Sequence, residues 1–243
     1  MEPPLRRPHI LLGLSGSVAS IKAAELCERL LEVGDVKVVA TDAARRFFKP
    51  EDLPAAALPV LGDDDEWRRW QRVGDDVLHI ELRRWADVLV VAPLSANTLA
   101  KLAAGLSDNL LTCVARAWNW RAGVRLPLLL VPAMNTLMWE SPLTARQLAA
   151  IQALGAVVVP PVSKRLACGD VGAGAMAAPG DVAAAVTAAL ARAANEVVCA
   201  APAARAPAEE AATQASGGVA AAGASLAALR THVAELERVQ VAL

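Results

Sequence analysis

The sequence lacks an excess of charge of either sign and lacks a long hydrophobic run. Its 24 basic and 25 acidic side chains leave a net charge of −1, so nothing electrostatic favours nucleic acid or an acidic membrane as a partner. No apolar stretch reaches the roughly 18 residues that a membrane-spanning helix requires. We therefore expect neither a nucleic-acid-binding protein nor a membrane protein.

A paired-cysteine motif is also missing. The four cysteines are scattered without a CxxC pair, which argues against a zinc site and fits a reducing compartment. Cys27 and Cys113 lie in helical patterns and are expected to be small core residues. Residues 1–8 are proline-rich and basic, and no secretory apolar core follows them. We expect a disordered N-terminus and a cytoplasmic protein.

The length of 243 residues fits one large α/β domain with an appendage. Residues 9–193 carry the patterns of that domain. From residue 194 onward the sequence is rich in Ala, Pro, Glu and Gly, which offers little large apolar surface to bury and predicts a disordered tail. Within it, leucines over 225–243 fit either a short docking helix or a frayed end.

Short apolar runs without polar interruption indicate strands covered on both faces, as in parallel sheets. They lie at 9–14, 36–40, 86–92, 126–131 and 156–159, the last being the final expected strand. Helical patterns cover residues up to 33, 99–105, 109–118, 144–154 and 180–193. The fold class we predict is α/β: a three-layer Rossmann-like (flavodoxin-like) parallel sheet with helices on both faces.

Two strands end in the same way, in proline, small residues and then asparagine. One end is residues 132–139, with Asn135, and the other is residues 93–98, with Asn97. In open α/β sheets ligands bind at these carboxyl ends, and the Asn135 amide suits a carboxylate. The alternative for Asn135 is a helix cap, which is the commoner use of asparagine there. Two such ends in one chain indicate a shared crevice.

The turn at 13–19 contains two glycines and two serines between a strand and a helix. It fits a phosphate cradle at a helix N-terminus or a plain tight turn, and it does not match the GxGxxG fingerprint. Thr41 follows the second strand, where it can contact a phosphate or cap a helix. The only phenylalanines, Phe47 and Phe48, fit core packing or contact with an aromatic cofactor.

The remaining segments leave more than one interpretation open. Residues 50–76 look irregular, with an acidic run at 62–66 expected to be a solvated surface. Residues 77–82 alternate apolar and polar sides around His79, which is either structural or catalytic. Residues 163–176 carry three glycines around Cys168 and are expected to form a mobile loop. The thiol of Cys168 is either functional or incidental.

Together these motifs resemble the flavoprotein family of cysteine decarboxylases, and within it the phosphopantothenoylcysteine decarboxylases. The resemblance covers residues 9–193 and is specific through the order and spacing of five motifs. Leu94 stands where the family often has a small residue, which affects flavin packing more than chemistry. The motifs lie at 13–19, 77–82, 93–98, 132–139 and 167–176.

The resemblance implies FMN bound at the carboxyl edge of the sheet. Bound FMN would oxidise and later reduce the substrate's thiol-bearing carbon, so that the neighbouring carboxylate leaves without net redox change. The residues expected to contact FMN are Gly16, Ser17, Val18, Thr41, Phe48, Ser95, Ala96, Asn97, Thr98, Ala133 and Met134.

The resemblance also implies the substrate, 4′-phosphopantothenoyl-L-cysteine, and the product, 4′-phosphopantetheine of coenzyme A synthesis. His79 is expected to act as the base of the decarboxylating half, and Cys168 to protonate the enethiolate during reduction. Asn135 is expected to hold the substrate carboxylate. The other expected substrate contacts are Met138, Ala167 and Gly169. No metal is expected.

Family members are trimers with FMN at a subunit boundary, so the resemblance implies a homotrimer, for which Trp67, Trp70 and Trp118 are candidate anchors. Alternatives remain open: a peptidyl-cysteine decarboxylase, a flavin prenyltransferase, or a non-catalytic flavoprotein that binds a protein phosphatase. A prenyltransferase would not need Asn135 and Cys168 together. A regulatory protein would not need His79 and Cys168.

Overall fold

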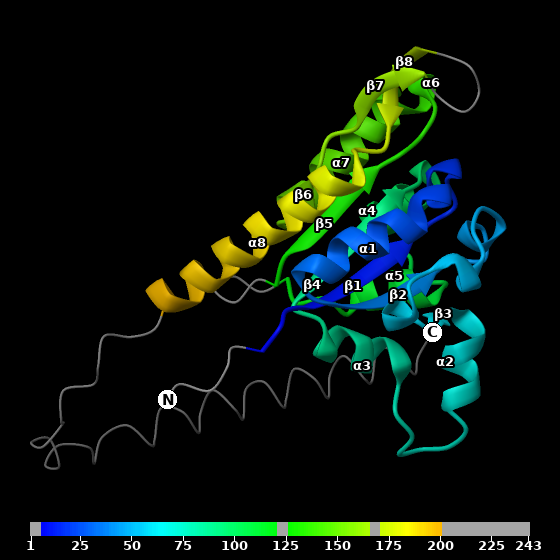
Figure 1. The fold of residues 1–243 in the computed structure, drawn as a ribbon, viewed down its shortest axis with the longest axis vertical. Helices are drawn as coiled ribbons and strands as arrows, with labels where there is room; N and C mark the ends of the chain where they lie inside the picture. The colour runs from blue at the N-terminus through cyan, green and yellow to red at the C-terminus, as the bar shows by residue number, and fades with distance from the viewer. Residues whose placement is uncertain (1–5, 121–125, 166–170, 201–243) are drawn as a thin grey trace, which may run out of the picture. The chain divides into compact units, whose positions relative to one another are not determined.

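A six-stranded parallel sheet forms the centre of the computed structural model, which describes residues 6–120, 126–165 and 171–200 (Figure 1). The strands are β1 (His9–Leu14), β2 (Asp35–Ala40), β3 (Val60–Leu61), β4 (Val88–Leu94), β5 (Leu128–Pro132) and β6 (Val157–Val158). Their order is β3-β2-β1-β4-β5-β6. This confirms the Rossmann-like sheet, and the order is that of the Rossmann fold rather than of flavodoxin.

Helices cover both faces of the sheet, as predicted. On one face α1 (Ala23–Val33), preceded by the 3-10 helix η1 (Val18–Lys22), packs beside α8 (Pro179–Ala200). The other face carries α3 (Leu78–Trp85), α4 (Ala96–Ala104), α5 (Leu110–Arg116) and α7 (Pro142–Ala153). The smaller elements are η2 (Ala44–Arg46), η3 (Pro50–Asp52), η4 (Ala55–Ala57), α2 (Asp63–Arg69), α6 (Thr136–Trp139), β7 (Val162–Arg165) and β8 (Val171–Ala175).

The central strands are apolar throughout because both faces of the sheet are covered. In β1, Ile10 and Leu12 pack against the α1–α8 layer, whereas Leu11 packs against the opposite layer, and all three are fully buried. Burying one such side chain contributes about 1.5–3 kcal/mol. The strand order reverses between β1 and β4, and ligands of Rossmann folds bind above this point.

Three predictions of secondary structure were wrong. The alternation of apolar and polar sides over 77–82 indicated a strand, but residues 78–82 form the start of helix α3, with Leu78 and Leu82 buried on one helical face. The irregular 50–76 region contains η3, η4, β3 and α2. The strand at 157–158 is not the last, because β7 and β8 pair as an antiparallel hairpin where a loop was expected.

The edges of the domain carry further contacts. Arg6 forms an ion pair with Asp87 at 2.8 Å, and the His9 N–H also donates to Asp87. Burial acts to raise the pKa of Asp87, but these hydrogen bonds outweigh it and hold the pKa below its usual value. Helix α8 continues past Ala193 to Ala200. Residues 1–5 and 201–243 lie outside the described part.

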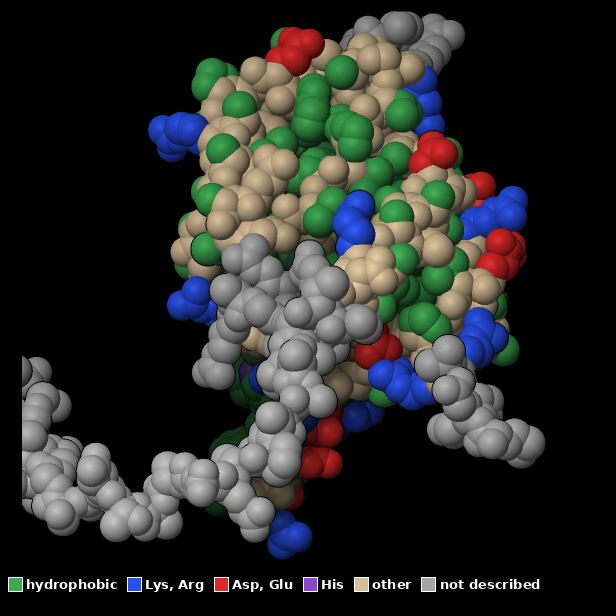
Figure 2. All heavy atoms as spheres, turned by 90° about the vertical axis from the view of Figure 1, so that its left-hand side faces the viewer, with side chains coloured by type: hydrophobic (Ala, Val, Ile, Leu, Met, Phe, Trp, Pro, Cys, Tyr) green, Lys and Arg blue, Asp and Glu red, His purple; other side chains and the backbone are tan. Residues whose placement is uncertain are grey.

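Charges of both signs are spread over the face seen in Figure 2 rather than gathered into a patch of one sign, in keeping with the net charge of −1. Within the described residues, no helix is both long and apolar enough to cross a bilayer.

Candidate active site

Ser15 joins the ends of the two central strands at the point where the strand order reverses. Its buried hydroxyl donates to the Pro93 carbonyl at 2.8 Å and accepts from the Ser95 N–H at 2.8 Å. The Ser20 hydroxyl in turn donates to the Ser15 carbonyl at 3.0 Å. No role was predicted for Ser15 itself, although a polar residue directly after an apolar strand was a usable signal. It fixes the β1 and β4 turns relative to each other.

We expect Ser15→Ala to lower the free energy of unfolding by about 1–3 kcal/mol, because the buried Ser95 N–H would lose its partner. Chemical denaturation followed by circular dichroism measures this. The control is Ser163→Ala, at an exposed serine of β7. Equal stabilities of the two variants would contradict the role given to Ser15.

The β1 turn also contacts the loops after β5 and β2. The Ser17 hydroxyl donates to the Ala133 carbonyl at 3.1 Å and accepts from the Ala19 N–H at 3.4 Å. A Cβ on Gly16 would lie 2.6 Å from that of Ala43, so only glycine allows this approach. The Thr41 hydroxyl accepts from the Ala44 N–H at 3.3 Å and so closes the turn before η2, whose own N-cap residue is Ala43.

Helix α4 begins at the same edge. The Ser95 hydroxyl caps it by accepting from the Thr98 N–H at 3.2 Å, and both side chains are buried. Ala96 and Asn97 form the first turn, where Asn97 is exposed. The helix N-terminus therefore offers N–H groups and partial positive charge to an anion beside the β1 turn.

The loop after β5 meets the β7–β8 hairpin. The Met134 N–H donates to the Gly174 carbonyl at 2.9 Å, and Asn135 caps α6 by accepting from the Leu137 N–H at 2.9 Å. Gly174 has a φ of 126°, and a Cβ there would lie 2.3 Å from the Met134 carbonyl oxygen. The cap interpretation of Asn135 is confirmed, and its ligand role stays a prediction.

This edge fits a flavin phosphate and ring. The backbone N–H groups at the helix N-termini, which begin at Val18 and Ala96, provide donors, while the hydroxyls of Ser17 and Ser95 are engaged in holding these turns. The Thr136 Oγ1 is buried and has no hydrogen-bond partner among the described residues. Exposed apolar side chains stand at the same edge, on Val18, Leu137 and Met138. Phe48 differs from the other flavin candidates, because it packs against the core of the α1–α8 layer.

His79 lies elsewhere, in a cluster formed by α2, α3 and α5. Its Nδ1 contacts the Glu66 carboxylate, and Figure 1 shows α3 and α6 well apart, with the sheet between them. One chain therefore does not bring His79 to Asn135. Ligand atoms of Glu66, His79 and Cys113 lie within 4.8 Å of one another. The Cys113 Sγ donates to the Ser107 carbonyl, which favours a hydrogen-bonded cluster, because a metal would need its thiolate.

The acidic run was wrongly predicted to be a solvated surface. The Asp63 carboxylate accepts from the Leu110 N–H at 2.7 Å and so caps α5. Asp65 accepts from the Gly62 N–H at 2.8 Å. Only Asp64 is exposed without such a contact among the described residues of the run. Carboxylates in this first turn also match the helix dipole.

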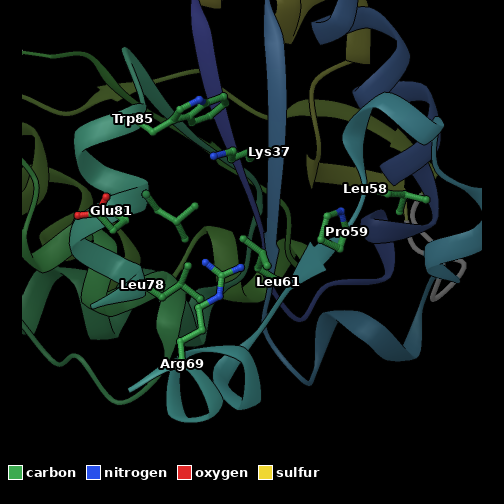
Figure 3. Close-up of a pocket in the computed structure, with 9 residues that line it drawn as sticks. Lys37, Leu58, Pro59, Leu61, Arg69, Leu78, Glu81 and Trp85 are labelled. Carbon is green, nitrogen blue, oxygen red and sulfur yellow. The ribbon is translucent and has the colours of Figure 1, made fainter. Parts of the chain in front are cut away.

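A separate hollow of about 270 Å³ lies between β2, β3, α2 and α3 (Figure 3). Lys37 places its Nζ 4.3 Å from the centre of the Trp85 ring, and Arg69 points into the same space. Burial and the nearby Arg69 charge lower the pKa of Lys37. None of the predicted flavin or substrate residues lines this hollow, so it is distinct from the strand-end site.

A family model described as Flavoprotein matches residues 2–191. The chain belongs to the flavoprotein family. This flavoprotein is 54% identical over 177 residues to a phosphopantothenoylcysteine decarboxylase of Oryza sativa subsp. japonica, covering 73% of this chain and 78% of the relative. The mouse phosphopantothenoylcysteine decarboxylase is 53% identical, with 71% of this chain and 82% of the relative covered.

Two solved structures resemble this flavoprotein closely. A Cys-to-Ser variant of a phosphopantothenoylcysteine decarboxylase, complexed with pantothenoylaminoethenethiol, has a TM-score of 0.71 and 51% identity, covering 74% of this chain and 97% of that chain. The FMN-binding protein AtHal3 has a TM-score of 0.69 and 52% identity, covering 74% of this chain and 95% of that chain. The family suggested by the sequence motifs is thereby confirmed.

Three predicted site residues of this flavoprotein lie outside the described part: Cys168, Ala167 and Gly169. The described strands β7 and β8 flank them in the sequence. Trp118 was wrongly predicted as an interface anchor, since it is buried and its Nε1 donates to the Leu126 carbonyl at 2.9 Å. Trp67 and Trp70 are exposed, as an interface role requires.

Proposed function

We propose that this flavoprotein binds FMN and decarboxylates 4′-phosphopantothenoyl-L-cysteine to 4′-phosphopantetheine in coenzyme A synthesis. The observation that carries the proposal is the identity above 50% with phosphopantothenoylcysteine decarboxylases over most of both chains. The fit of the strand-end edge to a flavin supports it independently of those names. FMN supplies reversible oxidation of the thiol-bearing carbon, which makes loss of the adjacent carboxylate feasible.

The chain's own residues bind FMN and orient the substrate. The β1 turn and the α4 N-terminus hold the FMN phosphate through the backbone N–H groups that follow Ser17 and Ser95. The flavin contacts proposed from the motifs at this edge are Gly16, Val18, Thr41, Ala96, Asn97, Thr98, Ala133 and Met134. Phe48 supports them from the core.

Three side chains act on the substrate in this proposal. His79 takes a proton during the oxidation–decarboxylation half, and Asn135 orients the substrate carboxylate. Cys168 returns a proton to the enethiolate in the reducing half. A relative solved as a Cys-to-Ser variant is complexed with an enethiol, which supports a role for a cysteine in this family after carbon dioxide has left. Met138, Ala167 and Gly169 complete the substrate pocket.

A homotrimer completes the site, because His79 and Asn135 lie on separate parts of one chain (Figure 1). Exposed apolar residues accompany both parts: Trp67 on α2, Trp70 directly after α2, and Leu137 on α6. Contact between two different surfaces is heterologous, and such contacts form a closed ring when the rotation between protomers closes. We propose that α2 and α3 of one protomer meet the strand-end edge of the next.

The proposed decarboxylase domain is residues 9–193, and the family match ends close to this limit, at residue 191. Residues 1–8 and 194–243 lie outside this domain, and trimming the chain after Ala193 tests whether the tail matters for decarboxylation. The reaction is placed in the cytoplasm, where scattered unpaired cysteines stay reduced.

A comparison of substrates tests the proposal. We expect the protein, purified with FMN, to release carbon dioxide from 4′-phosphopantothenoyl-L-cysteine and to leave a peptide ending in cysteine unchanged. FMN-dependent cysteine decarboxylases of other pathways resemble this chain at only 31% and 29% identity. Turnover of the peptide alone would make the chain a peptidyl-cysteine decarboxylase. Flavin binding without either turnover would favour a regulatory protein.

A further inference from the structure

We propose that Glu66 is a positioning residue that fixes the tautomer and orientation of the His79 imidazole, so that the Nε2 atom faces the substrate as the proton acceptor. The inference rests on the proposed function, because it depends on His79 as the base. It assigns a catalytic purpose to the acidic helix α2, which the sequence motifs did not include.

The carboxylate and the imidazole are in direct contact and largely shielded from water. The Glu66 side chain is 12% exposed and the His79 side chain 25%, and the Glu66 Oε1 contacts the His79 Nδ1. Burying a carboxylate away from water costs free energy unless the carboxylate is paired and hydrogen bonded. Glu66 is the one ion-pair partner of His79 in the described part of the chain. The pair is therefore a specific contact rather than a chance surface meeting.

Helix α2 holds Glu66 rigidly. Asp63 anchors the helix to α5 through the Leu110 N–H, and Asp65 closes its first turn on the Gly62 N–H. Both anchoring carboxylates lie within one helical turn of Glu66. A side chain on a helix fixed in this way loses little further freedom on pairing, so it orients its partner well.

The contact determines which ring nitrogen carries the proton. An ionised carboxylate only accepts hydrogen bonds, so the Nδ1 of His79 must donate. The neutral imidazole then keeps its lone pair on Nε2, at the far side of the ring. Glu66 also stabilises the positive charge that the ring gains when Nε2 takes a proton, as the carboxylate does in serine-protease triads.

Cys113, which forms a cluster with Glu66 and His79, adds no competing charge. Burial raises the pKa of the Cys113 thiol, and the charges of Glu66, Asp63 and Asp108 raise it further. The thiol also donates to the Ser107 carbonyl at 3.3 Å. Cys113 therefore remains a neutral thiol beside the pair.

The first test is Glu66→Gln in the FMN-loaded protein, assayed for carbon dioxide release. A carboxamide carries no negative charge and can either accept from Nδ1 or donate to it, so it neither fixes the ring proton on Nδ1 nor stabilises the charged ring. We expect kcat to fall about 10- to 100-fold, the scale seen when residues that orient a functional histidine are removed. KM, FMN content and the melting temperature are expected to stay unchanged.

The matched control is Asp64→Asn, which removes one negative charge from the same helix at an exposed position. We expect this variant to keep wild-type kcat. Equal kcat values for Glu66→Gln and Asp64→Asn would overturn the proposal, and so would a Glu66→Gln defect confined to KM or FMN content.

A second measurement needs neither turnover nor a stable Glu66 variant. Nitrogen-15 NMR of the wild-type holoprotein reports the tautomer of each histidine, and the chain has only three, so His79→Asn identifies the His79 signal. We expect the Nδ1–H form for His79. An Nε2–H form, or a stoichiometric metal ion found in the purified protein, would overturn the inference. Inactive wild type with the Nδ1–H form would instead overturn the proposed function alone.

Discussion

His79→Asn is expected to give a yellow, FMN-bound protein whose release of carbon dioxide is at least about 100-fold slower than that of wild type. The asparagine Nδ2 can still donate to Glu66, so the α2–α3 contact persists. Nothing then occupies the place of Nε2, and the proton has no acceptor. Flavin absorbance of the purified protein and a carbon dioxide assay measure the two properties together. A colourless variant would instead make His79 a structural or flavin-binding residue.

Mixing two inactive variants provides the control. If one site is built from His79 of one protomer and Asn135 of the next, refolding His79→Asn together with Asn135→Ala creates some sites with both residues intact. We therefore expect part of the wild-type activity to return in the mixture, although each variant alone is inactive. A mixture as inactive as its components would contradict the shared site.

Cys168→Ser is expected to stop the reaction after one release of carbon dioxide per site. A serine hydroxyl is a far weaker acid than a thiol, so the enethiolate does not receive its proton. The substrate remains as the enethiol, and the yellow absorbance at about 450 nm stays bleached, because the two electrons are not returned. Rapid-mixing absorbance and mass spectrometry of the bound product measure this.

The control for this prediction is Cys27→Ala, at a cysteine of α1 that is buried in the core of the α1–α8 layer. We expect this variant to complete the reaction. Normal formation of 4′-phosphopantetheine by Cys168→Ser would remove Cys168 from its role in the reducing half.

The central layers of the fold were predictable because their physical causes are local. Strand β1 has the predicted bounds, His9–Leu14, since a strand covered on both faces requires an unbroken apolar run. Helix α3 was missed because the apolar positions within residues 77–82 fit both the two-residue period of a strand and the 3.6-residue period of a helix. Leu78 and Leu82 fit both an alternating strand and two successive turns of one helical face.

The strand-end part of the site was also predictable, because parallel strands bring their carboxyl ends together whatever the loops contain. The contacts of the acidic run at 62–66 were not predictable. Asp63 meets Leu110 across 47 positions, and Glu66 meets His79 across 13, so no local pattern reveals either pair. The proposed relation of His79 to Asn135 was less accessible still, because it involves a second copy of the chain.

The proposed chemistry requires that the electrons taken from the substrate return to it within one turnover. The most direct measurement is the yield of carbon dioxide and 4′-phosphopantetheine from 4′-phosphopantothenoyl-L-cysteine by the FMN-loaded protein, without oxygen or any added electron acceptor. We predict many turnovers, with the two products formed in equal amounts. A requirement for an external acceptor, or full activity in protein stripped of flavin, would contradict the account.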